Sequence, residues 1–252
     1  MALKWCQGTI ADRQVWAEGL FTVKVDVPGV ESFQPGQFLQ VGTRIPSDEG
    51  EEHVYRPYSV ASPWGTRLEF FIVVVPEGRL TPRLWEMRPG DPLDISARAA
   101  GRFTLKHTPR AEHLWLVATG TGLAPYIAML RTDEPWQEYR KIIVIHGVRH
   151  GCDLAYADEL ARLGQSRPGQ LKYVPTVTRD EIPGGLTGRI PTLVEDGSLE
   201  SAAETELAAE TTAIMLCGNP AMLDDMEALL EQRGIRRHRS KSPGQLVLER
   251  YW

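Results

Sequence analysis

The sequence predicts a chain of two domains, an antiparallel β-barrel followed by an α/β domain with a doubly wound parallel sheet. Short runs of β-branched and aromatic residues fill residues 1–106, and Gly and Pro residues separate them, a pattern typical of small barrels. From His113 onward, apolar strands alternate with helical stretches, which indicates parallel pairing through right-handed crossovers. A length of 252 residues gives each domain room for its own core.

The expected strands of the first half are short and follow one another closely. Pro28-Gly29, Pro35-Gly36 and Pro89-Gly90 mark turns between them. A helix is expected over Thr81–Met87, with Thr81 as its N-cap and a proline at its first helical position. The predicted strands are Leu20–Val27, Gln37–Val41, Val54–Ala61, Leu68–Val75 and Leu93–Ser96.

The second half is expected to begin after a connection near Lys106–Glu112, so we divide the chain into residues 1–106 and 107–252. The acidic stretch Glu195–Glu210 is interpreted as a polar connection with a helical turn. Expected helices run from a glycine-rich turn to Leu130, over Asp153–Leu163 and over Ala221–Gln232. Expected strands lie within His113–Gly120, Lys141–Arg149, Leu171–Arg179 and Thr212–Pro220.

The composition is that of a soluble globular protein, and a formal net charge of −5 argues against nucleic-acid binding. The longest apolar run, Phe70–Val75, is far shorter than the roughly 20 residues of a membrane helix, and no signal-peptide pattern is present, so a cytoplasmic location is expected. Cys6, Cys152 and Cys217 form no CxxC pair, so neither a disulfide framework nor a cysteine-ligated iron–sulfur cluster is expected. Redox chemistry would need another cofactor.

The segment His53–Pro63 combines an arginine, an aromatic residue and a hydroxyl on one predicted strand. Alternate residues of a strand face the same way, so Arg56 and Tyr58 can meet one flat, charged ligand from one side. Arginine offers a donor fork for a phosphate, and Ser59 can hydrogen-bond the edge of a ring. An ordinary edge strand that ends in a turn would contain the same residues, and that alternative stays open.

A second possible phosphate site lies in the segment Pro76–Pro82. Its backbone amides, Arg79 and the hydroxyl of Thr81 at a helix N-terminus would together bind an anion. Two phosphate sites in two domains indicate two nucleotides.

Two small turns follow predicted strands of the second half. In Thr119–Pro125, Gly120 and Gly122 would let the backbone approach a diphosphate at the start of a helix. The Cys217–Pro220 turn again places a glycine and a helix start at the carboxyl edge of a parallel sheet, where such sheets bind ligands. Tight turns without a ligand, and a buried structural thiol at Cys217, are the alternatives.

Three arginines, Arg149, Arg179 and Arg189, lie at or just beyond predicted strand ends. They would fall along the same carboxyl edge of the sheet. An acidic residue there would favour NAD, whereas arginines suit a 2′-phosphate, so NADP is predicted. Surface arginines paired with acidic residues are the alternative.

The end of the chain has two unusual features. The segment Arg233–Lys241 holds six basic side chains and no acid, which fits either a solvated loop or a docking surface for an acidic partner. Tyr251 and Trp252 form an aromatic pair at the C-terminus, where they would be expected to pack or stack.

In combination, RPYS at 56–59, EGRLT at 77–81, GTGLAP at 120–125, CGNP at 217–220 and the terminal Tyr-Trp resemble the bacterial ferredoxin (flavodoxin)–NADP⁺ reductases over essentially the whole chain. The resemblance implies an FAD-binding barrel followed by an NADP-binding α/β domain. It implies FAD contacts by Arg56, Pro57, Tyr58, Ser59, Phe71, Val73, Arg79, Leu80, Thr81, Thr121, Tyr251 and Trp252. It implies NADP contacts by Gly120, Gly122, Arg149, Thr178, Arg179, Arg189, Cys217, Gly218 and Asn219.

The implied activity is electron transfer between NADP(H) and ferredoxin or flavodoxin, by hydride transfer between nicotinamide and flavin. Ser59, Tyr58, Cys217 and Glu249 are the candidate catalytic residues, with Glu249 assigned to proton movement or the domain contact. The alternatives are a free-flavin or oxygenase-associated NAD(P)H reductase and, in another class, a non-enzymatic flavin-binding module. Nothing in the sequence demands more than a monomer.

Overall fold

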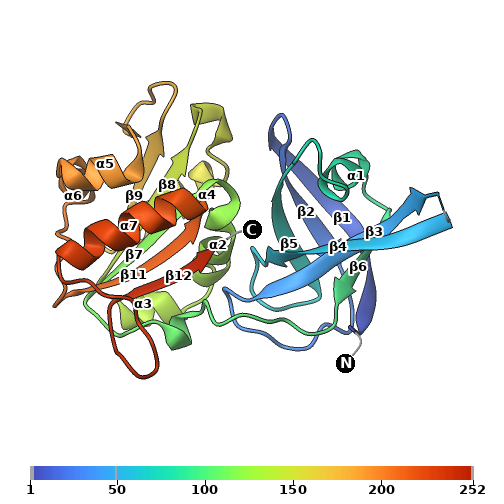
Figure 1. The fold of residues 1–252 in the computed structure, drawn as a ribbon, viewed down its shortest axis with the longest axis horizontal. Coiled ribbons are helices and arrows are strands. Elements are labelled where there is room, and N and C mark those ends of the chain that lie inside the picture. Colours follow the sequence, from blue (N-terminus) through green and yellow to red (C-terminus); the bar gives the residue numbers. More distant parts are fainter. Residues whose placement is uncertain (1–2, 49, 251–252) are drawn as a thin grey trace. The chain divides into compact units, whose positions relative to one another are not determined.

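The computed structural model describes residues 3–48 and 50–250, which form two compact units (Figure 1). The first unit runs through Thr104 and also takes in Ala124–Thr132. The second unit comprises Leu105–Leu123 and the chain from Asp133 onward. Among the described residues, no helix has the length and apolar character needed to cross a bilayer.

The first unit is built on a six-stranded sheet with the order β4-β3-β6-β1-β2-β5, in which every strand pair is antiparallel. A bridge between Val60 and Phe70 and a hydrogen bond from the Ala61 N–H to the Glu69 carbonyl (2.8 Å) bring the β4 end back to β5. The sheet therefore curls into the predicted barrel. Its strands are β1 Trp5–Ala17, β2 Leu20–Asp26, β3 Phe38–Ser47, β4 Gly50–Ser59, β5 Arg67–Val73 and β6 Pro92–Ser96.

The barrel core consists of the inward-facing aliphatic and aromatic residues of these strands, together with Leu80 and Leu84 of the helical segment. The helix α1 spans Thr81–Glu86, and the prediction that Thr81 is its N-cap is wrong. The hydroxyl of Thr81 instead accepts a hydrogen bond from the Val75 N–H (2.8 Å) and donates one to the Val75 carbonyl (3.3 Å). Thr81 thus ties the helix start to the end of β5.

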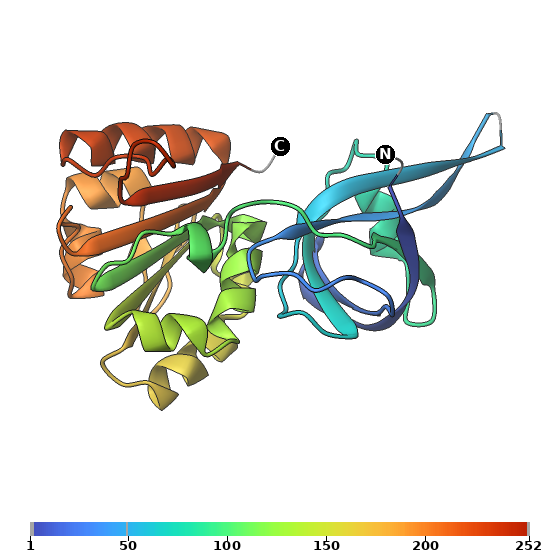
Figure 2. The same ribbon diagram turned by 90° about the horizontal axis from the view of Figure 1, so that it is seen from below.

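The β3–β4 hairpin pairs two strands of ten residues each (Figure 2). Its pairing is unbroken from Phe38↔Ser59 to Ser47↔Gly50, and Figure 2 shows its tip projecting beyond the other strands. Because the register has no bulge, alternate residues of β4 keep one face along the whole strand.

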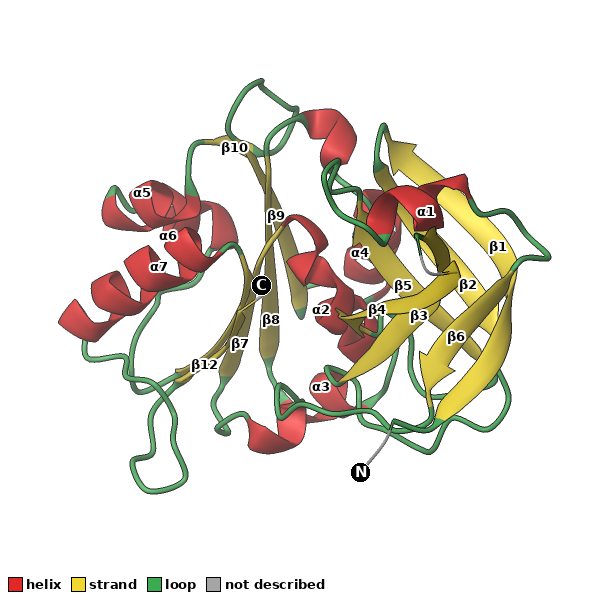
Figure 3. Ribbon diagram, turned by 45° about the vertical axis from the view of Figure 1, so that its right-hand side comes forward, coloured by secondary structure: helices red, strands yellow, loops and turns green. Residues whose placement is uncertain are grey.

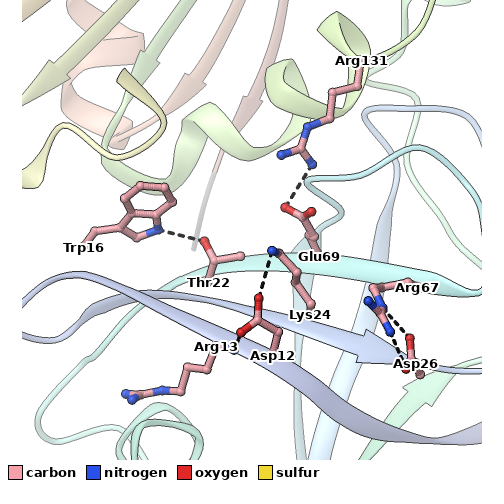
Figure 4. A network of polar contacts seen from close by, with 9 residues as sticks. All are labelled: Asp12, Arg13, Trp16, Thr22, Lys24, Asp26, Arg67, Glu69 and Arg131. Carbon is pink, nitrogen blue, oxygen red and sulfur yellow. Dashed lines mark hydrogen bonds and ion pairs between the residues drawn. The ribbon is translucent and has the colours of Figure 1, made fainter. Parts of the chain in front are cut away.

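An ion pair and a hydrogen bond of Arg131 join the barrel to the segment Ala124–Thr132 (Figure 4). The Arg131 guanidinium lies 3.0 Å from a carboxylate oxygen of Glu69 and donates to the Ala61 carbonyl at 3.1 Å. The helix α2, Ala124–Leu130, precedes this arginine and is buried at every position. This arrangement explains why a segment from the middle of the chain packs with the N-terminal barrel.

The second unit is built on a six-stranded parallel sheet with the order β10-β9-β8-β7-β11-β12. Figure 3 shows α5, α6 and α7 on one side of the sheet and α4 on the other, so the predicted doubly wound fold is confirmed. The strands are β7 His113–Thr119, β8 Lys141–Val148, β9 Leu171–Val177, β10 Leu186–Thr187, β11 Thr212–Gly218 and β12 Leu246–Arg250. The helices are α3 Glu134–Glu138, α4 Ala157–Ser166, α5 Ile190–Glu195, α6 Ser198–Ala203 and α7 Pro220–Gln232.

Several elements differ from the sequence predictions. The strands β1, β10 and β12 were not predicted, and neither were the short helices α3 and α5. The helix expected from Asp153 begins at Ala157, because Asp153 belongs to a preceding 3-10 turn in which its carboxylate accepts from the His150 N–H at 3.1 Å. The predicted proline at the start of α7 is confirmed, and Asn219 is the N-cap.

Candidate functional site

The strand β4 carries the predicted ligand face of the barrel. Arg56 is exposed, Tyr58 is half-buried against the barrel core, and Ser59 is buried. The unbroken register puts Glu52, Arg56 and Tyr58 on one face. An arginine and an aromatic side chain are therefore available side by side on one strand, as predicted.

A pocket of about 390 Å³ lies beside this strand, lined by Glu52, His53, Val54, Tyr55, Arg56 and Arg79. Arg79 comes from the turn after β5 and donates to both carboxylate oxygens of Glu52, at 3.1 and 2.7 Å. This pairing lowers the pKa of Glu52 and raises that of Arg79. Arg56 donates to the Tyr55 carbonyl at 2.7 Å, and its remaining N–H groups are donors for an anion. The pocket thus combines two predicted phosphate ligands with an acidic partner that the sequence analysis missed.

Tyr58 is held in its neutral form. Burial raises the pKa of the Tyr58 phenol to about 12, and nearby Arg56 lowers it only partly. A phenol with this pKa does not release its proton at neutral pH. Tyr58 can therefore support a planar ring, but it does not serve as a base.

The other predicted FAD contacts differ in exposure. Val73 is 37% exposed, which leaves its side chain accessible to a ligand. Phe71 and Leu80 are buried, and Leu80 is part of the barrel core, so Leu80 can offer only backbone groups to a ligand. Pro57 is exposed. Tyr251 and Trp252 lie outside the described residues.

The order of the parallel sheet reverses between β7 and β11, because the chain extends outward through β8, β9 and β10 before returning to β11. Ligands of doubly wound sheets bind at such a switch point, beyond the carboxyl ends of the strands. The two predicted glycine turns, Gly120–Leu123 after β7 and Cys217–Pro220 after β11, both lie there.

These two turns are packed directly against each other. A Cβ on Gly122 would lie 2.5 Å from the Cys217 carbonyl oxygen, and a Cβ on Gly218 would lie 2.2 Å from Thr119 Oγ1. Thr119 Oγ1 also accepts a hydrogen bond from the Asn219 N–H at 2.8 Å. Gly122 and Gly218 are therefore required by contact between the turns. Gly120, with a φ of 53° and open space around its Cα, is the glycine left for a ligand.

A buried histidine, which the sequence analysis missed, lies beneath the first turn. His146 Nε2 is 3.1 Å from the Gly120 carbonyl oxygen, and burial lowers the pKa of His146 to about 4. Because a carbonyl can only accept, Nε2 carries the proton of the neutral ring. A polar residue inside the apolar run KIIVIHGV was the signal that could have identified it.

The three predicted NADP arginines share one edge of the sheet. The strands β8, β9 and β10 end in register, with Val148 opposite Val177 and Val177 opposite Thr187, and an arginine follows each strand. Arg149, Arg179 and Arg189 are exposed. In residues 3–48 and 50–250, none of their side chains makes an ion pair or hydrogen bond. Thr178, also exposed, lies between β9 and Arg179.

The remaining candidate residues lie along the same edge. The register of β11 and β12 places Glu249 opposite Cys217, a proximity that the sequence did not show. Cys217 and Thr121 are buried, and a fully buried thiol is a poor nucleophile. Asn219 accepts from the Ala221 and Met222 N–H groups and so caps α7.

The basic side chains of the segment Arg233–Lys241 fall into two groups, those paired within the unit and those exposed. Arg233 pairs with Glu200 at 2.6 Å and donates to the Val194 carbonyl, and Arg237 lies 3.7 Å from Glu227. These two side chains belong to the fold of the unit. Arg236, Arg239 and Lys241 are exposed.

Comparison with known proteins agrees with this geometry over the length of the chain. Residues 116–228 match the family described as oxidoreductase NAD-binding domain. Flavodoxin/ferredoxin–NADP reductases of Shigella flexneri and Escherichia coli (strain K12) are 39% and 38% identical over 250 residues, 98% of this chain and 99% of each relative. A ferredoxin NADP⁺ reductase from Neisseria gonorrhoeae, crystallised with bound FAD and NADP, matches with a TM-score of 0.91 and 31% identity over 99% of both chains. A match of this extent covers both the barrel pocket and the arginine-bearing sheet edge, and the chain therefore belongs to the flavodoxin/ferredoxin–NADP reductase family.

Proposed function

We propose that this chain is an FAD-dependent reductase that moves electrons between NADP(H) and ferredoxin or flavodoxin. The observation that carries the proposal is that each unit has its own set of arginines. Arg56 and Arg79 line the barrel pocket, and three arginines without an ion pair to any described residue follow the strands β8, β9 and β10. Family membership supports the same pair of nucleotides, since the relative from Neisseria gonorrhoeae binds FAD and NADP.

The barrel residues fit a flavin dinucleotide. Arg56 and Arg79 would hold the diphosphate, because guanidinium groups bind phosphate oxygens through paired N–H donors. Arg79 would release Glu52 to do so. Tyr58, Ser59 and the exposed Val73 would hold the ring system, with the neighbouring Pro57 and Phe71 shaping its surroundings. Leu80 and Thr81 would contribute through the backbone of the turn that carries Arg79.

When bound, FAD supplies the ability to accept two electrons as a hydride and to release them one at a time. The residues of this chain orient the ring and control its surroundings. Tyr58 remains protonated, as its pKa of about 12 requires, and so keeps an uncharged face toward the ring. Cys217 would contact the nicotinamide without acting as a nucleophile, and Glu249, opposite it on β12, would move a proton.

NADP is proposed over NAD because the sheet edge is basic. Arg179 and Arg189 would hold the 2′-phosphate, and Arg149 with Thr178 would complete its surroundings. The Gly120–Leu123 and Cys217–Asn219 turns at the switch point would border the rest of the dinucleotide.

We assign residues 1–106 to the FAD domain and residues 107–252 to the NADP domain, and propose a monomer that works in the cytoplasm. All three cysteines are free, which fits a reducing compartment. The electron carrier would be an acidic protein that meets the exposed basic side chains near Arg239.

Absorbance spectroscopy tests the proposal. The purified chain is expected to be yellow, to retain FAD through gel filtration, and to lose its flavin absorbance when NADPH is added without oxygen. Cytochrome reduction with NADPH should rise when ferredoxin is supplied. A colourless protein that takes up no FAD would refute the proposal, and loss of flavin on gel filtration would instead favour a free-flavin reductase.

A further inference from the structure

Two neighbouring loops carry two of the three arginines at the sheet edge. The loop after β8 holds Arg149, and the loop after β9 holds Arg179. The Arg149 carbonyl accepts hydrogen bonds from both the Thr178 N–H (3.3 Å) and the Arg179 N–H (2.9 Å). The backbones of the two arginines are therefore in direct contact.

An acidic side chain adds a second link between these loops. The Asp180 carboxylate accepts from the Gly151 N–H through both oxygens, at 3.2 and 2.9 Å, and lies 3.6 Å from His150 Nδ1. On the other side of the same loop, the Asp153 carboxylate accepts from the His150 N–H at 3.1 Å. Three successive residues from Arg149 to Gly151 are thus held through their backbone groups.

Packing supports the same arrangement. A Cβ on Gly151 would lie 2.6 Å from Ile182 Cγ2, so the second loop lies tightly over the first at this point. The glycine at 151 allows this approach and brings its N–H within reach of Asp180.

We infer that Asp180 is a positioning residue that joins the Arg149 and Arg179 loops into one preformed surface for the 2′-phosphate of NADP. The inference rests on the proposed function. A site whose backbone is already ordered loses less conformational freedom on binding, so its phosphate contacts contribute more fully to affinity.

The charge of Asp180 makes the inference testable. A carboxylate near a phosphate site opposes anion binding, so its negative charge does not explain its presence there. The hydrogen bonds that Asp180 accepts from the Gly151 N–H explain its presence. An asparagine at this position keeps an oxygen acceptor and removes the charge.

Calorimetric titration with adenosine 2′,5′-bisphosphate tests the inference in the full chain loaded with FAD. Asp180→Ala should weaken binding of this probe about tenfold, whereas Asp180→Asn should bind it as tightly as the original chain or more tightly. Glu181→Ala is the matched control, because Glu181 is the adjacent exposed acid and its side chain makes no hydrogen bond or ion pair with the Arg149 loop among the described residues. In steady-state kinetics, Asp180→Ala should raise the KM for NADPH and leave kcat and the KM for NADH nearly unchanged.

The outcomes separate the inference from the function on which it depends. If Asp180→Ala binds the probe as well as Asp180→Asn does, or if both variants lose affinity equally, Asp180 does not position the loops through its hydrogen bonds. If the original chain binds adenosine 2′,5′-bisphosphate no better than 5′-AMP, the NADP assignment is overturned together with this inference.

Discussion

Loss of Arg179 and Arg189 should raise the KM for NADPH much more than the KM for NADH. Replacing both with alanine should raise the KM for NADPH at least about tenfold, because a hydrogen bond to a charged group is typically worth about 1.5–3 kcal/mol. The KM for NADH should change little, since NADH has no 2′-phosphate. Steady-state kinetics with both nucleotides would check this, and equal effects on the two would contradict the assignment.

Arg56 should matter for flavin retention more than a barrel arginine that lies outside the pocket. Arg56→Ala is expected to weaken FAD binding about tenfold or more, because it removes a donor fork from the pocket. Arg67→Ala is the matched control, since Arg67 is exposed and pairs with Asp26 on the barrel surface (Figure 4). Fluorescence titration of the flavin-free proteins with FAD would measure both. Equal losses of FAD affinity in the two variants would show that Arg56 is not part of the FAD site.

His146 should make the protein sensitive to mild acid. Its pKa falls from 6.5 to about 4 on folding, so between these values the unfolded chain binds more protons, and the free energy of unfolding falls as the pH is lowered. From pH 7 to pH 5 the loss should be about 2 kcal/mol from this residue alone. The glutamine of His146→Gln can still donate to the Gly120 carbonyl and does not titrate. The free energy of unfolding of this variant should therefore fall by less than that of the original chain from pH 7 to pH 5. Chemical unfolding at the two pH values compares them, and identical losses would exclude His146 as the cause.

At the scale of elements, the two turns at the switch point should tolerate alanine unequally. Gly122→Ala should lower the free energy of unfolding by about 3 kcal/mol, because the new Cβ would meet the Cys217 backbone. Gly120→Ala should cost about 1 kcal/mol, since it meets only the strain of a positive φ in open space. Thermal or chemical unfolding of both variants provides the measurement. A reversed order would show that the turns are not packed as described.

The elements that the sequence predicted correctly are those with strong local signals. Apolar runs such as Lys141–Val148 and Pro-Gly punctuation in the barrel identified most strands. The strand β1 was missed because the exposed Asp12 and the half-buried Arg13 break the apolar alternation. The strand β12 was missed because its place depends on pairing with β11, a contact that no local pattern encodes.

At the scale of the whole molecule, electron transfer to a protein acceptor should weaken with salt. Arg236, Arg239 and Lys241 are exposed on a chain of net charge −5, so they form a local basic surface. Reduction of ferredoxin or flavodoxin should fall about tenfold from low salt to about 0.3 M salt, because screening suppresses steering of an acidic partner. Reduction of a small neutral acceptor is the control. If the rate with the protein acceptor does not depend on salt, this segment is an ordinary solvated loop and not a docking surface.

The site was predictable where its residues are close in the sequence and not where the fold brings them together. The Arg56–Ser59 group and the arginines after strand ends follow from strand periodicity and from the edge rule for parallel sheets. The pairing of Arg79 with Glu52 joins residues 27 positions apart and depends on the long β3–β4 hairpin. Asp180 and Gly151 are 29 positions apart, on loops whose contact is set by neighbouring strands.

The interlocked turns have a consequence for how this protein can diverge. A Cβ on Gly122 would meet the Cys217 carbonyl, and a Cβ on Gly218 would meet the Thr119 backbone as well as its hydroxyl. A smaller neighbouring side chain does not relieve a clash with backbone atoms, so neither glycine can be exchanged together with a partner. In a large collection of descendants, Gly122 and Gly218 should therefore both be retained, while Gly120 should vary independently of them.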